Sequence, residues 1–244
     1  MLYFKCVLND YYRPMVGCFL INLLKISKIE FVYFDDFSNR VSKIENLELP
    51  GSASHYKMTP MFRLKELESG EIVKKNPRQA AVMALFYPNV DYRTNLLLIL
   101  RNTYKGIHSN QIALPGGKVE KTDKNLLETA LRETQEEVGA VREQITVIRS
   151  MSEIYIPPSN FEVTPYLGLY KKEKPFLRQV DEVAAIVEVP LHDFMDDKKI
   201  FHQILNTSYA QNVEVPAFKL NGYTVWGATA MMLSEIKELF KQVL

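Results

Sequence analysis

Three glutamates in the middle of the chain, Glu133, Glu136 and Glu137, are spaced so that a helix would bring them together. At about 100° per residue, Glu137 lies about 40° to one side of Glu133 and Glu136 about 60° to the other. Three carboxylates in one sector, near the C-terminal end of a helix, repel one another and the helix dipole. A divalent cation would relieve that repulsion, and hard oxygen ligands suit Mg²⁺ or Mn²⁺. The spacing therefore predicts a metal site formed by these glutamates.

A solvated acidic helix face is the alternative explanation of such a cluster. Pairing with Arg132 would relieve only part of the repulsion, because an exposed ion pair contributes about 0–1 kcal/mol. The segment just upstream argues for a built site, since Pro115 is followed by Gly116 and Gly117. This sequence requires a tight backbone path that side chains would obstruct.

The helix that presents the glutamates has a predicted start, buried face and end. Polar residues up to Asp123 or Asn125 supply the N-cap, and Gly139 suits the position just after the C-terminus. The sequence therefore predicts a helix from Asn125 to Val138. One arc of this helix should meet a sheet. The residues of that arc are Leu127, Ala130, Leu131, Thr134 and Val138.

Short apolar runs elsewhere predict the strands of that sheet. Ala80 to Tyr87 and Leu96 to Leu100 are continuously apolar, as expected of strands covered on both faces. Further predicted strands are Ile145 to Ile148, Val163 to Tyr170, Val183 to Val189, Val213 to Phe218 and Tyr223 to Trp226. A second helix is predicted from Ala228 to Val243. Strands combined with two main helices predict an α/β fold, an α/β/α sandwich around a mixed β-sheet.

The chain divides into three predicted parts. Residues 1–35 are rich in aromatic residues without a clear period, which predicts an accessory or weakly ordered N-terminal extension. Residues 36–76 predict a lead-in of helices and loops, ended by Asn76-Pro77. Residues 77–244 form the predicted catalytic domain.

The composition excludes several classes of protein. The 244 residues are 47% hydrophobic and 24% charged, with a net charge of +1, so no global field attracts nucleic acid or acidic membranes. Both cysteines lie in the first 20 residues, which excludes a disulfide scaffold for the body of the chain. No segment has the run of about 20 apolar residues that a membrane span requires. We therefore expect a cytoplasmic protein that binds neither nucleic acid nor membranes.

The segment from Gly117 to Ala140 resembles the box of the Nudix hydrolase family, G-x5-E-x7-R-E-U-x-E-E-x-G-U, in which U is apolar. The matching residues are Gly117, Arg132, Glu133, Glu136, Glu137, Gly139 and Ala140. The interval from Gly117 to Arg132 is one residue longer than in the box, and Thr134 replaces an apolar residue. Asp123 stands where the first glutamate is expected.

With these departures, the segment resembles the coenzyme A pyrophosphatase branch of that family. The branch has an upstream motif, L-L-T-x-R-[SA]-x3-R-x3-G-x3-F-P-G-G. The residues that fit it in register are Leu97, Leu98, Arg101, Pro115, Gly116 and Gly117. The departures are Ile99, Asn102, Gly106, Asn110 and Leu114. Gly106 replaces the second arginine of the motif, and the neighbouring Lys105 is its predicted substitute.

The resemblance implies metal-dependent hydrolysis of the diphosphate linkage of coenzyme A or its derivatives. The products would be 3′,5′-ADP and 4′-phosphopantetheine, or its acyl form. Glu133 and Glu137 would hold Mg²⁺ or Mn²⁺, with Glu136 as a further ligand or a water-orienting base, and Arg132 would orient a glutamate. The expected substrate-binding residues are Arg101, Lys105, His108, Gly116, Gly117 and Lys118. Glu153 and Glu162 are further candidates for an acid facing the site.

Three alternative functions and one oligomeric state are considered from the sequence. A Nudix pyrophosphatase for another nucleoside diphosphate derivative, such as ADP-ribose or NADH, is the same-class rival. A non-catalytic ligand sensor on the same fold would be expected to lose its metal-binding glutamates, and all three are present. A nucleic-acid binder is disfavoured because no basic stripe with interleaved aromatic residues is present. The sheet and the terminal helix leave room for a homodimer.

Overall fold

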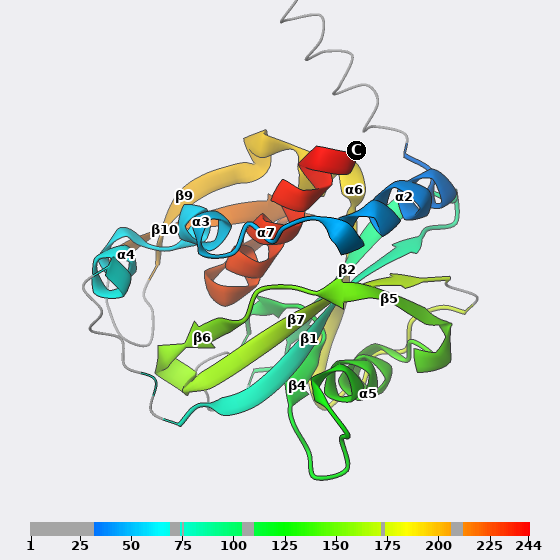
Figure 1. Ribbon diagram of the computed structural model, residues 1–244, viewed down its shortest axis with the longest axis horizontal. Helices are drawn as coiled ribbons and strands as arrows, with labels where there is room; N and C mark the ends of the chain where they lie inside the picture. Colours follow the sequence, from blue (N-terminus) through cyan, green and yellow to red (C-terminus); the bar gives the residue numbers. More distant parts are fainter. Residues whose placement is uncertain (1–31, 69–73, 75, 104–109, 172–173, 206–211) are drawn as a thin grey trace, which may run out of the picture.

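A computed structural model describes residues 32–68, 74, 76–103, 110–171, 174–205 and 212–244 (Figure 1). Nearly all of the predicted extension, residues 1–31, lies outside the described residues, as do Lys105 and His108. In the described part, no helix is both long and apolar enough to cross a membrane.

An eight-stranded mixed sheet forms the centre of the molecule, with the strand order β3-β2-β1-β7-β5. In this sheet β4 pairs with β1, β6 with β7 and β8 with β2. The parallel pair is β1 with β7, and the other pairs are antiparallel. The strands are β1 (Arg78–Pro88), β2 (Thr94–Arg101), β3 (Ile112–Ala113), β4 (Gly116–Lys118), β5 (Ile145–Ser150), β6 (Ile154–Ile156), β7 (Phe161–Tyr170) and β8 (Val183–Pro190).

A second, three-stranded sheet has the order β11-β10-β9 and precedes the terminal helix. Its strands are β9 (Ile200–Leu205), β10 (Val213–Leu220) and β11 (Tyr223–Trp226). The α-helices are α2 (Phe34–Val41), α3 (Ser52–His55), α4 (Met61–Glu68), α5 (Leu126–Val138), α6 (Leu191–Met195) and α7 (Gly227–Val243). Short 3₁₀ helices are η1 (Ser42–Asn46), η2 (Tyr56–Met58), η3 (Arg142–Gln144), η4 (Pro157–Ser159) and η5 (Asp197–Lys199).

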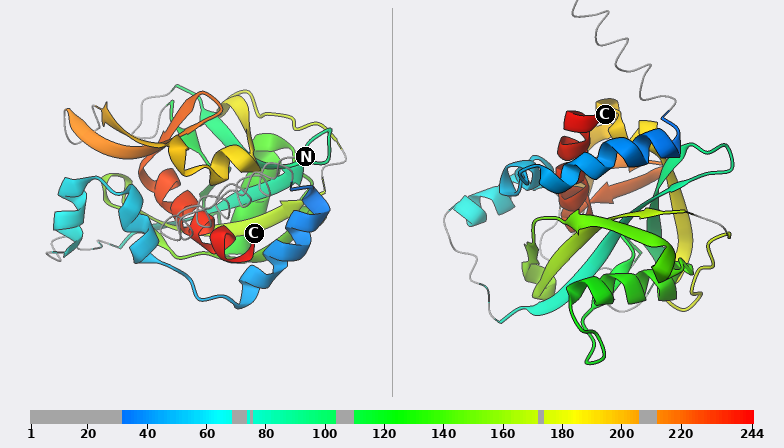
Figure 2. Two further views of the ribbon diagram at one scale, coloured as in Figure 1. Left: turned by 90° about the horizontal axis from the view of Figure 1, so that it is seen from above. Right: turned by 45° about the vertical axis from the view of Figure 1, so that its right-hand side comes forward.

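Strand β1 separates two hydrophobic cores, because its side chains alternate between the two faces of the sheet. Ala84 and Phe86 face the core that contains α7, which we call the α7-side core. Met83 and Leu85 face the core that contains α5, the α5-side core. Helices α5 and α7 accordingly lie on opposite sides of the sheet (Figures 1 and 2). The predicted α/β/α sandwich with a mixed sheet is confirmed, and burial on both faces explains why β1 is continuously apolar.

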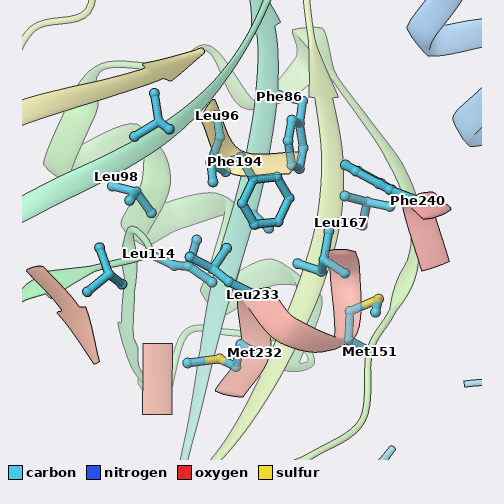
Figure 3. Packing of buried hydrophobic residues seen from close by; sticks show 14 of the residues in the cluster. Phe86, Leu96, Leu98, Leu114, Met151, Leu167, Phe194, Met232, Leu233 and Phe240 are labelled. Atoms are coloured by element: carbon cyan, nitrogen blue, oxygen red, sulfur yellow. The ribbon is translucent and has the colours of Figure 1, made fainter. Parts of the chain in front are cut away.

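The α7-side core is the larger of the two and is rich in aromatic side chains. Phe86, Phe194 and Phe240 meet there, and the rings of Phe86 and Phe240 lie 5.0 Å apart (Figure 3). Met232 and Leu233 from α7 pack in the same core, beside Leu114 from the segment that leads into the glycine loop. This packing fixes α7 relative to the sheet.

The lead-in belongs to this core as well. Phe37, Val41, Ile44 and Met58 are fully or almost fully buried there. The Arg149 guanidinium on β5 also donates to the carbonyl oxygens of three residues between positions 44 and 47. The lead-in thus packs on the domain whose start the sequence placed at residue 77.

The predicted elements compare closely with the observed ones. All seven predicted strands and both main helices are present, with bounds shifted by a few residues. Four of the observed strands, β3, β4, β6 and β9, were not predicted. Strand β9 has no continuous apolar run and no side fully buried, so its sequence carries no strong strand signal.

Candidate active site

Helix α5 begins and ends as its sequence predicts. The Asn125 side chain accepts a hydrogen bond from the backbone N–H of Glu128 at 2.9 Å, which makes it the N-cap. Gly139 has the left-handed conformation (φ 70°), and its N–H bonds to the carbonyl of Gln135. Of the predicted buried arc, Leu127 is half-buried and the other four residues are buried. The helix is therefore held with the glutamates at the edge of its buried face.

The two glycines fit the backbone against both the sheet and the helix. Gly116 has φ 148°, and a Cβ there would lie 2.3 Å from the Ala81 carbonyl oxygen on β1. A Cβ at Gly117 would lie 2.5 Å from the carboxylate carbon of Glu133. Glycine at these positions lets β4 pair with β1 while the Glu133 carboxylate lies over the loop. The Gly116 N–H also donates to Glu137 Oε2 at 2.8 Å.

Three carboxylates meet beside this loop. Oxygen atoms of Glu133, Glu137 and Glu182 all lie within 4.8 Å of one another, and we call these residues the carboxylate cluster. Glu136, the third predicted ligand, is outside this group and accepts a hydrogen bond from Arg132 at 3.0 Å. Its side chain is 56% exposed. A metal-binding or base role for Glu136 stays a prediction.

Glu182 is the residue of the cluster that sequence reasoning missed. It lies immediately before β8, more than 40 positions after α5 in the sequence. Its only sequence signal is an acidic residue at the start of a predicted strand, which is too common to identify a site. Of the two acids proposed instead, Glu153 lines the cavity described below. Glu162 forms an ion pair with Lys74 and accepts from Gln79.

The cluster is electrostatically unfavourable without a cation. Burial is the main cause that raises the pKa of Glu137 to about 8, and the nearby Glu133 and Glu182 carboxylates contribute to this rise. The Gly116 N–H and Arg101, whose guanidinium lies 3.7 Å from Glu137, oppose this shift only in part. Burial also raises the pKa of Glu133. Glu133 and Glu137 are desolvated, and the exposed Glu182 lies beside them, so the three carboxylates suit a divalent ion with hard oxygen ligands.

Arg132 binds the protein and thereby positions the glutamates. Its guanidinium donates to both carboxylate oxygens of Asp123 at 2.9 Å. It also donates to Glu133 at 3.1 Å and to Glu136 at 3.0 Å. These hydrogen bonds hold the pKa of Asp123 well below its usual value. Asp123, which replaces the first glutamate of the box, therefore acts as an anchor for Arg132.

A large cavity of about 900 Å³ opens from the carboxylate cluster. Its size suits a nucleotide-derived small molecule. Four of the predicted substrate-binding residues line it, namely Arg101, Gly116, Gly117 and Lys118. The lead-in also contributes to the lining, with His55, Tyr56 and Arg63 among its residues. No motif or spacing in the sequence indicates that this segment reaches the site.

Comparisons with known proteins identify a family model and curated relatives that match this chain. A family model described as the NUDIX domain matches residues 77–207. The chain is 33% identical over 174 residues to a protein of Pectobacterium atrosepticum named "Uncharacterized Nudix hydrolase NudL", covering 65% of this chain and 81% of that protein. It is 34% identical over 165 residues to the protein of that name from Cronobacter sakazakii, covering 66% of this chain and 82% of that protein.

Solved structures with a similar arrangement are more distant. A MutT/nudix family protein from Enterococcus faecalis is 19% identical, with a TM-score of 0.45, covering 78% of this chain and 71% of that chain. The NUDIX domain of Shewanella oneidensis NrtR, solved with ADP ribose, is 21% identical, with a TM-score of 0.41, covering 56% of this chain and 86% of that chain.

Proposed function

The chain belongs to the Nudix hydrolase family and is thus a pyrophosphohydrolase of nucleoside diphosphate derivatives; from this premise we propose that its substrate is coenzyme A or a derivative. Hydrolysis of the diphosphate linkage would give 3′,5′-ADP and 4′-phosphopantetheine, or its acyl form. The observation that supports this most is the placement of Arg101. The upstream motif of the coenzyme A branch supplies this arginine, and its guanidinium lies 3.7 Å from Glu137.

The donor set fits the divalent metal that this reaction requires. Glu133, Glu137 and Glu182 would hold Mg²⁺ or Mn²⁺, because the oxygens of all three converge and burial disfavours unpaired charge on Glu133 and Glu137. When bound, such an ion neutralises the diphosphate and lowers the pKa of a coordinated water. Glu136, largely exposed beside the cluster, is proposed as a further ligand or as the base that orients water.

The cationic residues of the cavity are proposed to bind the phosphates. Arg101 and Lys118 line the cavity, and a guanidinium offers paired donors to phosphate oxygens. The Gly116–Gly117 backbone would adjoin the diphosphate. Lys105 and His108 remain proposed contacts on the basis of sequence. Arg132 is a positioning residue, since its hydrogen bonds go to Asp123, Glu133 and Glu136.

A rival substrate within the same family is ADP-ribose or NADH. The observation in its favour is Gly106, which replaces the second arginine of the coenzyme A motif. Among these substrates only coenzyme A carries a 3′-phosphate, which a second arginine could bind.

A comparison of substrates tests the proposal directly. Coenzyme A, 3′-dephospho-coenzyme A, ADP-ribose and NADH are supplied at equal concentration, with Mg²⁺ and with Mn²⁺, and the products are quantified by chromatography. We expect the highest kcat/KM with coenzyme A or its derivatives and a lower value without the 3′-phosphate. A clear preference for ADP-ribose would overturn the branch assignment while leaving the family unchanged.

Two further proposals concern organisation. We propose residues 77–244 as the catalytic domain and residues 36–76 as a lead-in that completes its cavity, with residues 1–35 as an extension.

We also propose that the protein forms a homodimer. The molar mass of the full chain, measured by light scattering, tests it.

A further inference from the structure

We infer that Asn102 and Gln179 are positioning residues of the metal site, because together they hold the backbone that carries the Glu182 carboxylate. This inference rests on the proposed function, in which Glu182 is one of the three carboxylates that bind a divalent ion. It deepens that proposal by giving a role to residues 177–182, which we call the ligand loop, and to the end of strand β2.

Glu182 differs from the other two carboxylates of the cluster in how it is held. Glu137 is 2% exposed, and its carboxylate accepts from the Gly116 N–H at 2.8 Å. Glu133 accepts from Arg132 at 3.1 Å. Glu182 is exposed, and among the described residues no group donates a hydrogen bond to its carboxylate. A glutamate side chain has several rotatable bonds, so the backbone at this position decides whether the carboxylate reaches the cluster.

The ligand loop begins against the C-terminal end of α5. The Leu177 N–H donates to the Val138 carbonyl oxygen at 3.0 Å, and the Gln179 N–H donates to that of Glu137 at 2.9 Å. The last carbonyl groups of a helix have no partner within the helix, and these two hydrogen bonds satisfy them. Gly139 leaves the space, since a Cβ there would lie 3.1 Å from the Cβ of Leu177. The loop is thus fixed to the turn of helix that carries Glu137.

Gln179 closes the turn that leads to Glu182. Its side-chain oxygen Oε1 accepts from the Glu182 N–H at 2.7 Å. Its carbonyl oxygen accepts from the N–H groups of Glu182 at 3.3 Å and of Val183 at 2.9 Å. A side-chain oxygen that accepts from a backbone N–H three residues later fixes the local backbone, as an N-cap residue does at the start of a helix. Gln179 therefore holds Glu182 from the N-terminal side of the loop.

Asn102 holds the same loop from the end of β2. Its backbone N–H donates to the Glu182 carbonyl oxygen at 2.8 Å, and its side-chain Nδ2 donates to the Val180 carbonyl oxygen at 2.8 Å. The register of the β2–β8 pair is irregular immediately before Arg101, and such bulges redirect the residues that follow. Arg101 lies 3.7 Å from the Glu137 carboxylate. Two consecutive residues of β2 and its extension thus contact two members of the carboxylate cluster.

Asn102 is also one of the departures from the upstream motif of the coenzyme A branch, which has Ser or Ala at this place. Alanine has no side-chain donor, and a serine hydroxyl extends less far than an asparagine amide. The residues of the motif would therefore not provide the hydrogen bond that Asn102 makes to Val180. This departure has a structural consequence at the metal site.

The expected consequence is tighter binding of the metal. A ligand that is already in place loses less conformational freedom when the ion binds. Residues that hold metal ligands typically change metal affinity about 10- to 100-fold when they are substituted. Asn102→Ala removes the side-chain hydrogen bond but keeps the backbone N–H, so the pairing of β2 with β8 should persist.

The test is a titration of the full chain with Mn²⁺ in the absence of substrate, in which the electron paramagnetic resonance signal of the free ion gives Kd. We expect Asn102→Ala and Gln179→Ala each to raise Kd about tenfold, with the thermal transition of the metal-free protein unchanged. Asn221→Gly is the matched control, because the Asn221 amide donates to the Glu188 carbonyl oxygen at 3.0 Å, at the other end of β8. Asn221 has φ 44°, which glycine adopts readily, so this variant should leave Kd unchanged.

A double variant separates positioning from a general effect on the fold. Because Asn102 acts through Glu182, Asn102→Ala should add little to the loss of affinity in a Glu182→Gln background. A further tenfold loss in that background would overturn the inference. So would an unchanged Kd in both single variants, with or without a lower thermal transition. Wild type that binds no Mn²⁺ would overturn the carboxylate cluster as well, whereas the identity of the substrate is decided separately by the comparison of substrates.

Discussion

At the scale of single residues, Glu137 combines burial with two neighbouring carboxylates of the same charge. Glu137→Gln should lower metal-dependent kcat/KM by at least about 100-fold, because metal stabilises the developing charge by several kcal/mol. The fold should persist, since a glutamine oxygen can still accept from the Gly116 N–H. Steady-state kinetics and thermal unfolding provide the measurements. The exposed Glu143→Gln is the control, and near wild-type turnover of Glu137→Gln would exclude Glu137 as a ligand.

Glu182 is the acid that the fold brings to the cluster from a distant position. Glu182→Gln should weaken the binding of Mg²⁺ or Mn²⁺, raising the metal concentration for half-maximal rate about tenfold or more. Glu153→Gln is the matched comparison, because Glu153 also lines the cavity but is not in the cluster. A larger effect of Glu153→Gln would reassign the third carboxylate.

Asp123 anchors Arg132, and its substitution should affect both stability and rate. Asp123→Asn should cost about 3 kcal/mol of unfolding free energy, since it breaks a largely buried ion pair. The folded-state pKa of Asp123 lies below its usual 3.8, so its stabilisation is fully present above that pH and is lost as the pH falls further. The difference between wild type and variant, measured by urea unfolding, should therefore shrink from about pH 7 to about pH 3.

The exposed Asp91→Asn provides the control for this experiment. Activity of Asp123→Asn should fall mainly in kcat, because Arg132 no longer holds the glutamates in place. An unchanged difference in stability at both pH values would contradict the ion pair as its source.

At the scale of elements, the glycine loop and α5 are fitted to each other by two different contacts. Gly117→Ala would place a methyl group against the Glu133 carboxylate, the flexible end of a side chain, so the fold should persist while activity falls about 10- to 100-fold. Gly116→Ala would meet the β1 backbone instead and should lower the thermal transition strongly. Activity and thermal unfolding of the two variants, measured side by side, check this. A destabilised Gly117→Ala with full specific activity would contradict it.

At the scale of the whole molecule, the lead-in contributes to the same core as the catalytic domain. Phe37 is fully buried, 5.3 Å from the ring of Phe240 on α7. Phe37→Ala should lower the unfolding free energy by about 3–5 kcal/mol and keep a single transition. Tyr33→Ala is the control, because Tyr33 is 53% exposed. Two separate transitions, or no loss of stability, would show that the lead-in folds independently of the domain.

Much of the fold and the centre of the site follow from local sequence. Helix α5 is specified by its N-cap Asn125 and by Gly139, and β1 by its apolar run. The glutamates follow from helical spacing, because 3.6 residues per turn determines which side chains share a face. Such patterns depend only on residues close together in the chain, so the amino-acid sequence is sufficient to predict the family and the first two members of the cluster.

The other members of the site are brought together only by the folding of the whole chain. Glu182 and Tyr56 lie far from α5 in the chain, and no spacing rule relates them to it. They meet because β8 pairs with β2, and because the lead-in packs on α7 through Phe37 and Glu235. Burial in the folded protein also raises the pKa of Glu137. The residues next to Glu137 in the sequence do not reveal this desolvation. Contacts between distant segments are determined by the packing of the whole core, and these contacts complete the site.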